Sequence, residues 1–197
     1  SGRWAHQRPV RVGVSAPRKD RGMGLFDIFK KAAAPQKPEA LSVSCPAGSI
    51  LAPVAGKAIA LEKVSDMVFN SGAMGKGCGI EPSEEVVYAP VSGTLTAAGA
   101  PNHHAVGITG DDGAEVLIHV GVDTVEMAGE GFTVYATKGA HVSAGEPLLS
   151  FSKQKIAAAG HDTVVIMALT NTDDLASVEL VHEGDVKAGE VVVKFSA

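Results

Sequence analysis

Residues 44–197 alternate short runs rich in Val, Ile and Thr with turns rich in Gly, Pro, Asn and Asp, and this pattern is the strongest constraint on the fold. Val, Ile and Thr favour extended strands, whereas Gly and Pro favour tight turns. Because the 197-residue chain contains 23 Gly and 10 Pro, long helices are disfavoured. The pattern predicts a single all-β domain over residues 44–197, built as an antiparallel β-sandwich or a barrel-like sheet.

Two stretches of this region suit a very short helix. Residues 152–159, SKQKIAAA, are followed by Gly160, a residue that commonly ends helices. Residues 172–178 are expected to form a short helical turn that is capped at its start by Asn171 or Thr172. The rest of the domain is predicted to be strand and loop.

Two short motifs occur twice in the domain. APVAG at residues 52–56 recurs as APVSG at 89–93, and VSAGE at 142–146 recurs as VKAGE at 186–190. The two spacings differ, so the motifs do not indicate a regular solenoid. They predict internal pseudo-symmetry, in which similar hairpins are used twice.

The N-terminal 43 residues have a different character. Residues 1–22 lack any period and are predicted to be a disordered leader, or an extension upstream of a natural start at Met23. Residues 23–43 comprise a short amphipathic segment, MGLFDIFKK, and a linker. The amphipathic segment suits peripheral contact with an anionic membrane, and a stub without function is the alternative.

Charge is distributed unevenly along the chain. Residues 1–38 contain nine Lys or Arg and two Asp, a net charge of +7, whereas residues 39–197 contain 8 basic and 20 acidic residues, a net charge of -12. An acidic domain disfavours nucleic acid and favours a basic protein partner. No apolar run approaches the roughly 18 residues of a membrane span, and no secretory signal is recognisable, so we expect a cytoplasmic location. Cys45 and Cys78 lack C-x-x-C spacing and are expected to be packed thiols.

His119 interrupts the apolar run Val116–Val122. In a strand, the side chains of Leu117, His119 and Gly121 share one face. Because Gly121 has no side chain, the imidazole is predicted to be open to a partner. A core histidine that is hydrogen-bonded to the backbone is the alternative interpretation.

His104 lies 15 residues before His119, and the turn at residues 109–113 separates the two. A hairpin around this turn would place the two imidazoles near each other. Such a pair suits a shared metal, acid–base chemistry, or phosphorylation of one ring with support from the other. A catalytic metal needs a third protein ligand, and Asp123, if it continued the strand, would lie roughly 13 Å from His119. The absence of G-x-S-x-G, Walker-type and H-E-x-x-H motifs weakens hydrolase and nucleotide-dependent kinase hypotheses.

Residues 113–125, GAEVLIHVGVDTV, resemble the phosphorylation-site signature of the glucose-type enzyme IIA of the bacterial phosphoenolpyruvate-dependent sugar phosphotransferase system. The similarity covers roughly three quarters of the chain, which is more specific than one short motif. It includes residues 51–53, 66–69, 75–82, 89–93 and 129–132 and continues to the carboxyl end. Residues 23–27, MGLFD, also resemble the start of free-standing members.

This resemblance implies a compact antiparallel β-sandwich that acts as a phosphocarrier. His119 would accept a phosphoryl group on Nε2 from the phosphocarrier protein HPr and pass it to a cysteine of a IIB sugar-permease domain. His104 would orient and stabilise the phosphoryl group. The chain would thus be a phosphotransferase component with no independent turnover of a small substrate. It would need no cofactor beyond the transient phosphohistidine, although the histidine pair could bind incidental zinc.

The resemblance also implies partner contacts near the histidines. Asp66 and Asp123 match acidic positions that meet a basic surface of HPr. Val68 and Phe69 match an apolar contact rim, and ordinary core packing is their alternative interpretation. The IIB and IIC permease components would place the protein in the cytoplasm, at the inner face of the membrane.

Three further residues are expected to support the site. Asn102 stands where the family usually has Thr, which puts the usual hydroxyl relay to the active histidine in doubt, and Thr124 and Asp173 match supporting positions. Two departures also stand out: Ala100 replaces a common aromatic residue, and His103 adds an imidazole beside His104.

Two other functions remain open from the sequence. Glu62-Lys63-Val64 and the Gly-rich residues 139–148 suggest a lipoyl- or biotinyl-like carrier, but such domains are near half this length and do not need a histidine pair. A zinc hydrolase of the lysostaphin type also uses histidines on a β-sheet, and the missing third ligand counts against it.

Overall fold

The computed structural model describes residues 35–197, so the predictions for residues 1–34, including the leader and the amphipathic segment, lie outside the described residues. Residues 35–48 are extended or turn-like and precede the first strand. The strands are β1 (Ser49–Leu51), β2 (Gly56–Ala60), β3 (Lys76–Pro82), β4 (Val86–Tyr88), β5 (Gly93–Ala97), β6 (Ala105–Gly110), β7 (Glu115–Val120), β8 (Phe132–Val134), β9 (His141–Val142), β10 (Pro147–Phe151), β11 (Val165–Leu169), β12 (Ser177–Leu180), β13 (Gly184–Val186) and β14 (Val191–Ser196). The helices are α1 (Met67–Asn70) and α2 (Lys153–Ala158), and the 3-10 helices are η2 (Leu61–Lys63), η3 (Thr124–Met127) and η4 (Thr172–Asp174).

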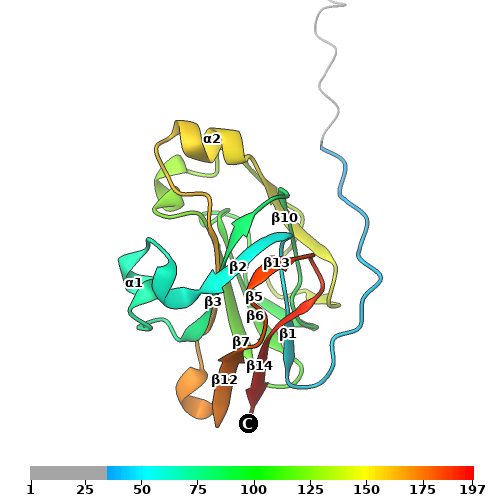
Figure 1. Cartoon of the computed structure of the whole chain (residues 1–197). Helices are drawn as coiled ribbons and strands as arrows, with labels where there is room; N and C mark the ends of the chain where they lie inside the picture. The colour runs from blue at the N-terminus through cyan, green and yellow to red at the C-terminus, as the bar shows by residue number, and fades with distance from the viewer. Residues whose placement is uncertain (1–34) are drawn as a thin grey trace, which may run out of the picture. The chain divides into compact units, whose positions relative to one another are not determined.

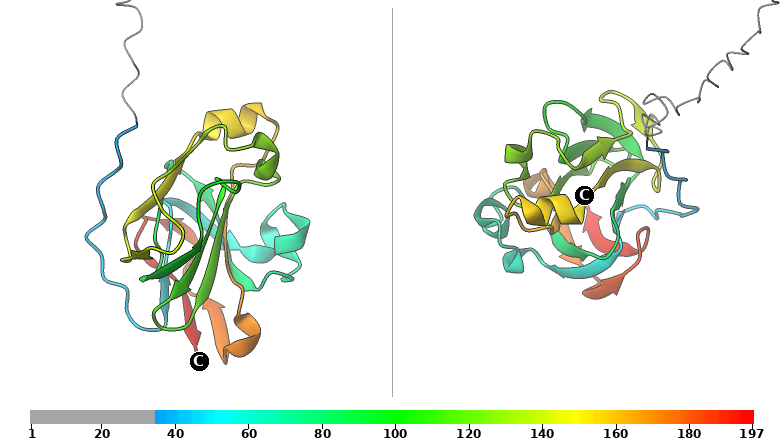
Figure 2. Two further views of the ribbon diagram at one scale, coloured as in Figure 1. Left: turned by 180° about the vertical axis from the view of Figure 1, so that it is seen from behind. Right: turned by 90° about the horizontal axis from the view of Figure 1, so that it is seen from above.

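The described strands form three antiparallel sheets (Figures 1 and 2). The large sheet has eight strands in the order β13-β2-β3-β11-β7-β6-β5-β9, and two smaller sheets have the orders β1-β14-β12 and β4-β10-β8. Within residues 35–197 the large sheet has two open edges, β13 and β9, and does not close into a barrel. The structure therefore confirms the predicted antiparallel sandwich and rejects its closed-barrel form.

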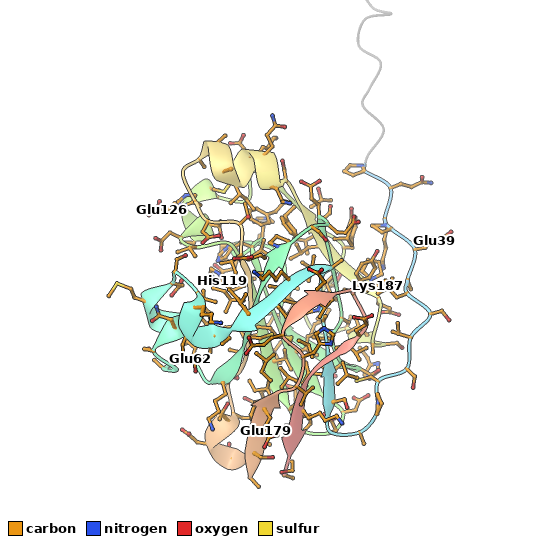
Figure 3. The ribbon with its side chains drawn as sticks, viewed as in Figure 1. Glu39, Glu62, His119, Glu126, Glu179 and Lys187 are labelled. Atoms are coloured by element: carbon orange, nitrogen blue, oxygen red, sulfur yellow. The ribbon has the colours of Figure 1, made fainter. Side chains whose placement is uncertain are left out.

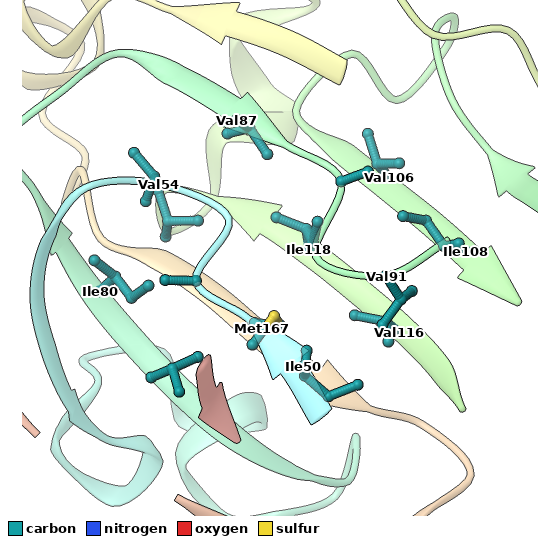
Figure 4. Close-up of a cluster of buried hydrophobic side chains, with 14 of the residues drawn as sticks. Ile50, Val54, Ile80, Val87, Val91, Val106, Ile108, Val116, Ile118 and Met167 are labelled. Atoms are coloured by element: carbon teal, nitrogen blue, oxygen red, sulfur yellow. The ribbon is translucent and has the colours of Figure 1, made fainter. Parts of the chain in front are cut away.

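One apolar core joins the three sheets. Ile50 of β1, Val87 of β4 and Ile118 of β7 are fully buried in it (Figure 4). Burying a side chain such as Ile118 stabilises the fold by about 1.5–3 kcal/mol. Cys78 of β3 lies in the same core, and burial raises the pKa of its thiol to about 12. The prediction of a packed thiol is confirmed for Cys78.

The repeated sequence motifs occupy equivalent places at the two ends of the large sheet. Gly56 begins β2 and pairs with Val186 of β13, while Gly93 begins β5 and pairs with Val142 of β9. Both glycines face a neighbouring strand so closely that a Cβ atom would lie about 2.1–2.2 Å from a backbone oxygen, which only glycine permits. The predicted pseudo-symmetry is confirmed.

The turns at residues 144–146 and 188–190 share the sequence AGE, and both contact the side chain of Val43. The amide of Leu41 donates to the carbonyl of Gly145 at 2.9 Å. A Cβ atom on Gly145 would lie 2.7 Å from Cγ2 of Val43, and one on Gly189 would lie 2.6 Å from Cγ1 of Val43. Val43 therefore packs between the two turns of the pseudo-repeat.

We expect Gly189→Ala to lower the free energy of unfolding by about 2–3 kcal/mol, because alanine would meet both a left-handed backbone and the stiff Val43 side chain. Gly184→Ala is the matched control: Gly184 has a similar φ of 93°, against 91° for Gly189, but no atom lies within 4 Å of its Cβ position. It should cost only about 1 kcal/mol. Urea titration measures both variants, and equal losses would show that the Val43 contact contributes nothing.

The helix predictions had mixed outcomes. The helix expected at residues 152–159 is α2, and the Ser152 hydroxyl caps it by accepting from the Lys155 amide at 3.2 Å. The turn expected over residues 172–178 was too long, because β12 begins at Ser177 and pairs with β14. Helix α1 was not predicted. None of the helices among residues 35–197 has the length and apolar character of a membrane span.

Candidate functional site

The β6–β7 hairpin brings two histidines together. Ala105 pairs with His119, and the amide of Val120 donates to the carbonyl of His104 at 2.9 Å. The two imidazole centroids lie 4.8 Å apart at an interplanar angle of 79°. The predicted proximity of His104 and His119 is therefore confirmed. His104 is 7% exposed, whereas His119 is partly exposed beside α1 (Figure 3).

A backbone hydrogen bond fixes the tautomer of His119. Its Nδ1 lies 2.8 Å from the carbonyl oxygen of Gly121. A carbonyl oxygen can only accept, so Nδ1 carries the proton and Nε2 keeps a free lone pair. The arrangement makes Nε2 the nucleophilic atom of the ring.

Gly121 acts differently from the sequence prediction. Strand β7 ends at Val120, and Gly121 turns the chain with a φ of 77°. A Cβ atom there would lie 2.4 Å from Cγ2 of Thr124 and 2.9 Å from the carbonyl oxygen of Asp162. The residue thus permits a tight turn whose carbonyl holds His119, rather than an open space on a continuing strand.

Burial keeps both imidazoles neutral. It lowers the pKa of His104 to about 4, with further lowering by His119 and His103. Burial also lowers the pKa of His119, and the Gly121 hydrogen bond, Asp66 and Asp123 oppose that shift without reversing it. At pH 7 the Nε2 lone pair of His119 is consequently available.

His103 lies beside the pair and in contact with a glycine loop. Its Nδ1 is buried without a hydrogen-bond partner among the described residues. A Cβ atom on Gly129 would lie 2.7 Å from that nitrogen, so the loop packs directly on the ring. Phe132, at the end of the same loop, lies edge-on to His104 with ring centroids 6.4 Å apart.

Helix α1 forms one side of the site. The Asp66 carboxylate caps it by accepting from the amides of Val68 and Phe69 at 2.9 and 3.1 Å. Phe69 is only 6% exposed and packs on His119 with ring centroids 5.3 Å apart, so it supports the ring, whereas Val68 is exposed. Met67, which is 82% exposed, was not singled out from the sequence.

The turn after β7 forms the opposite side. Asp123 has a left-handed φ of 57°, and its charge raises the pKa of His119. The estimate that placed Asp123 far along a strand was wrong, because the strand ends at Val120. Thr124 is fully buried, and its hydroxyl donates to the carbonyl of Val120. Val125 is exposed on η3 and was also missed by the sequence reasoning.

Two predicted supporting residues stand apart from the histidine ring contacts. Asn102 is exposed, and its side chain forms no hydrogen bond with residues 35–197. Asp173 lies on η4, beyond the end of β11 that carries Leu169, whereas His119 pairs with Ile166 toward the other end. The structure does not bring Asp173 to the histidine pair.

The site has few candidate metal ligands. In the part of the chain that the structure describes, no group of three or more His, Cys, Asp or Glu side chains is placed to hold a metal ion. A lysostaphin-type zinc site needs a third protein ligand beside the two histidines, so this alternative gains no support.

The fold and the site define a class of protein. An antiparallel β-sandwich presents one nucleophilic imidazole, a second neutral imidazole beside it, and a rim of carboxylates and exposed apolar side chains. These features suit a domain that carries a group on histidine and meets another protein.

Comparison with known proteins agrees with this class. The chain matches the family described as phosphoenolpyruvate-dependent sugar phosphotransferase system, EIIA 1, over residues 48–175, and it belongs to that family. It is 42% identical over 147 residues to the PTS system beta-glucoside-specific EIIBCA component of Bacillus subtilis (strain 168), covering 75% of this chain and 24% of the relative. It is 37% identical over 145 residues to the PTS system glucose-specific EIIA component of Staphylococcus aureus (strain COL), covering 74% of this chain and 87% of the relative.

A solved structure supports the same assignment. Glucose permease IIA from Mycoplasma capricolum superimposes with a TM-score of 0.68 at 36% sequence identity, covering 74% of this chain and 93% of that chain. The chain spans about a quarter of the length of the beta-glucoside EIIBCA relatives that it matches. The family has a phosphocarrier role in sugar uptake, which makes the domain a phosphotransferase component, and the lipoyl- or biotinyl-like alternative is not favoured.

Proposed function

We propose that His119 accepts a phosphoryl group on Nε2 from phosphorylated HPr and passes it to a cysteine of a IIB domain. The hydrogen bond between His119 Nδ1 and the Gly121 carbonyl carries this proposal, because it directs the free lone pair to Nε2. In the first step the Nε2–P bond forms as the donor's P–N bond breaks. In the second, a cysteine thiolate attacks phosphorus and the electron pair returns to Nε2. No cofactor is required.

His104 supports the phosphoryl group in this proposal. Its pKa of about 4 leaves the ring neutral at pH 7, so one ring nitrogen can donate a hydrogen bond. The ring lies nearly perpendicular to that of His119. A fixed donor beside the transferring group stabilises the charge on its oxygens without reorganisation of water.

The rim of the site provides the partner surface. Asp66 and Asp123 act electrostatically on His119, and Met67, Val68 and Val125 are exposed around it. We infer that a basic, partly apolar surface of HPr docks here, steered by the net charge of -12 on residues 39–197. The IIB domain, which needs the same phosphorylated atom, would use an overlapping surface.

The sugar and the location are also part of the proposal. Relatives named for beta-glucosides and for glucose match this domain at 42% and 37% identity, so we expect the IIB and IIC partners to select the sugar. These partners would place the domain in the cytoplasm, at the inner face of the membrane. The sequence of residues 23–31 supports an additional peripheral contact with that membrane.

The test is labelling of the full chain with radioactive phosphoenolpyruvate, enzyme I and HPr. We expect one acid-labile, base-stable phosphate per chain, which mass spectrometry at neutral pH maps to His119. Omission of HPr should remove the label. A phosphate that survives acid, or one that maps to another residue, would overturn the proposal.

A further inference from the structure

The segment that follows α2 contacts several loops around His119. Helix α2 ends at Ala158, Gly160 has a left-handed φ of 85°, and the amide of His161 donates back to the carbonyl of Ile156 at 3.1 Å. This closed C-terminal turn fixes the direction in which the chain leaves the helix. It places His161 and Asp162 at the edge of the His119 site.

Asp162 joins two loops that are far apart in sequence. One carboxylate oxygen accepts from the hydroxyl of Ser65 at 2.8 Å, across 97 residues of chain. The other accepts from the amide of Val164 at 2.9 Å. The backbone carbonyl of Asp162 accepts from the amide of Val122 at 3.1 Å, and that of Val164 accepts from the amide of Gly121 at 2.7 Å.

Each of these loops fixes a different part of the His119 environment. Ser65 immediately precedes Asp66, whose carboxylate caps the start of α1 and raises the pKa of His119. On the other side, Gly121 supplies the carbonyl that holds Nδ1 of His119. Asp162 therefore connects the docking side of the site to the turn that orients the nucleophile.

A neighbouring side-chain contact adds a third connection. His161 is a mostly buried side chain, 13% exposed, and its Nε2 lies 3.7 Å from a carboxylate oxygen of Glu126. Glu126, labelled in Figure 3, belongs to η3, the helix that also presents the exposed Val125. Residues 161–162 thus contact the loop before α1, the turn after β7, and η3.

We propose that Asp162, acting through Ser65, is a positioning residue for phosphoryl transfer that holds Asp66 and α1 in register with His119. This inference rests on the proposed function of His119. Asp162 does not touch the reacting atoms, so it acts through the loop that carries Asp66. Helix α1 has only four residues, and a helix this short depends on contacts outside itself for its position.

The physical consequence is a loss of docking geometry rather than of chemistry. Without the Ser65 hydroxyl, Asp162 keeps its bonds to the Val164 and Val122 amides, so the turn that orients His119 stays in place. The loop that carries Asp66 loses its hydrogen bond to Asp162, while Phe69 of α1 keeps its packing on His119. We therefore expect a higher KM for phosphorylated HPr with little change in kcat.

The test compares Ser65→Ala with Ser65→Thr, which retains a hydroxyl. Ser65→Ala should raise the KM for phosphorylated HPr by about threefold to tenfold, in line with the loss of one hydrogen bond that is open to solvent. Ser65→Thr should restore most of the loss. Ser177→Ala is the matched control, because Ser177 makes an exposed hydroxyl contact of 2.7 Å with Ser196 on the β12–β14 pair, and it should leave KM unchanged.

A double-mutant cycle tests whether Ser65 acts through Asp162. The effect of Ser65→Ala should be absent in an Asp162→Ala background. Additive effects, or equal KM values for Ser65→Ala and Ser177→Ala, would overturn the inference. If Asp162→Ala fails to fold, the comparison of Ser65→Ala with Ser65→Thr still decides.

A second readout separates this inference from the proposed function. Asp66 and Asp123 raise the pKa of His119, whereas burial lowers it, and His104 is the other titratable ring in contact. Loosening the Asp66 loop should lower the His119 pKa in NMR titrations of Ser65→Ala but not of Ser177→Ala. The titration needs no HPr, so it does not depend on phosphorylation. If the parent chain cannot be phosphorylated, the proposed function is rejected, and the titration still tests whether Ser65 holds Asp66 near His119. An unchanged pKa of His119 in Ser65→Ala would also reject the positioning role.

Discussion

His119→Asn is expected to reduce phosphoryl transfer from phosphorylated HPr by more than about a thousandfold, because it removes the nucleophilic atom. Asparagine is chosen because its amide nitrogen can occupy the place of Nδ1 and continue to donate to the Gly121 carbonyl. The turn after β7 should then keep its shape, and the free energy of unfolding should change little. Labelling with phosphoenolpyruvate, enzyme I and HPr measures the effect.

The control for this variant is His141→Asn. His141 lies on β9, and its Nε2 is 2.9 Å from a carboxylate oxygen of Asp111. This exposed contact is separate from the His104–His119 pair, so labelling should remain at the parental level. Undiminished labelling of His119→Asn would mean that another residue carries the phosphate.

The parts of the site that could be predicted from the sequence are those set by local pattern. An apolar run with one histidine predicts a strand that presents an imidazole on one face, and a Gly-Asp-rich turn predicts the hairpin partner. These two signals were sufficient to place His104 near His119, as the 4.8 Å ring separation confirms. The roles of the two rings came from the family resemblance and not from the pattern.

The end of β7 could not be predicted in the same way. Val122 is apolar and extends the alternation beyond Val120, so Gly121 itself was the local signal for a turn, and the alternation around it favoured a continuing strand. The Gly121 amide still bonds to the Val164 carbonyl in the register of the β7–β11 pair, but the Val122 amide bonds to the carbonyl of Asp162, one residue out of that register, and Gly121 has a φ of 77°. Tertiary contacts therefore determine the backbone conformation of Gly121, the residue whose carbonyl orients His119.

Helix α1 and its link to Asp162 show a second limit. Four residues give too little periodicity to identify a helix, and only Asp66 as a cap followed by the run MVFN could have indicated one. Asp162, the hydrogen-bond partner of Ser65, lies 97 residues away, and the sequence around Ser65 gives no indication of it. The pseudo-repeat was recognisable as two motifs, but the packing of Val43 between its two turns was not.

His104→Ala should separate acceptance of the phosphoryl group from its onward transfer. The carbonyl of His104 bonds the Val120 amide through the backbone, so truncation of the side chain leaves the β6–β7 pairing intact. His119 keeps its Gly121 partner and its lone pair, and the variant should still be labelled to about one phosphate per chain. Transfer from the preformed phosphohistidine to a IIB cysteine should fall by about a hundredfold, which is typical for loss of one fixed donor to a developing charge.

Single-turnover transfer from the isolated phospho-protein to a IIB domain measures this step, and His104→Gln is the informative companion. Its amide nitrogen can stand near the position of the imidazole Nε2 and donate, so we expect part of the lost rate to return. Because the pKa of His104 is about 4, the parental rate should show no titration of this ring between about pH 6 and 8. Parental transfer rates in His104→Ala would remove any role for the second imidazole. A variant that cannot be labelled at all would instead place His104 in the accepting step, where a neutral donor is needed as soon as the phosphoryl group begins to leave HPr.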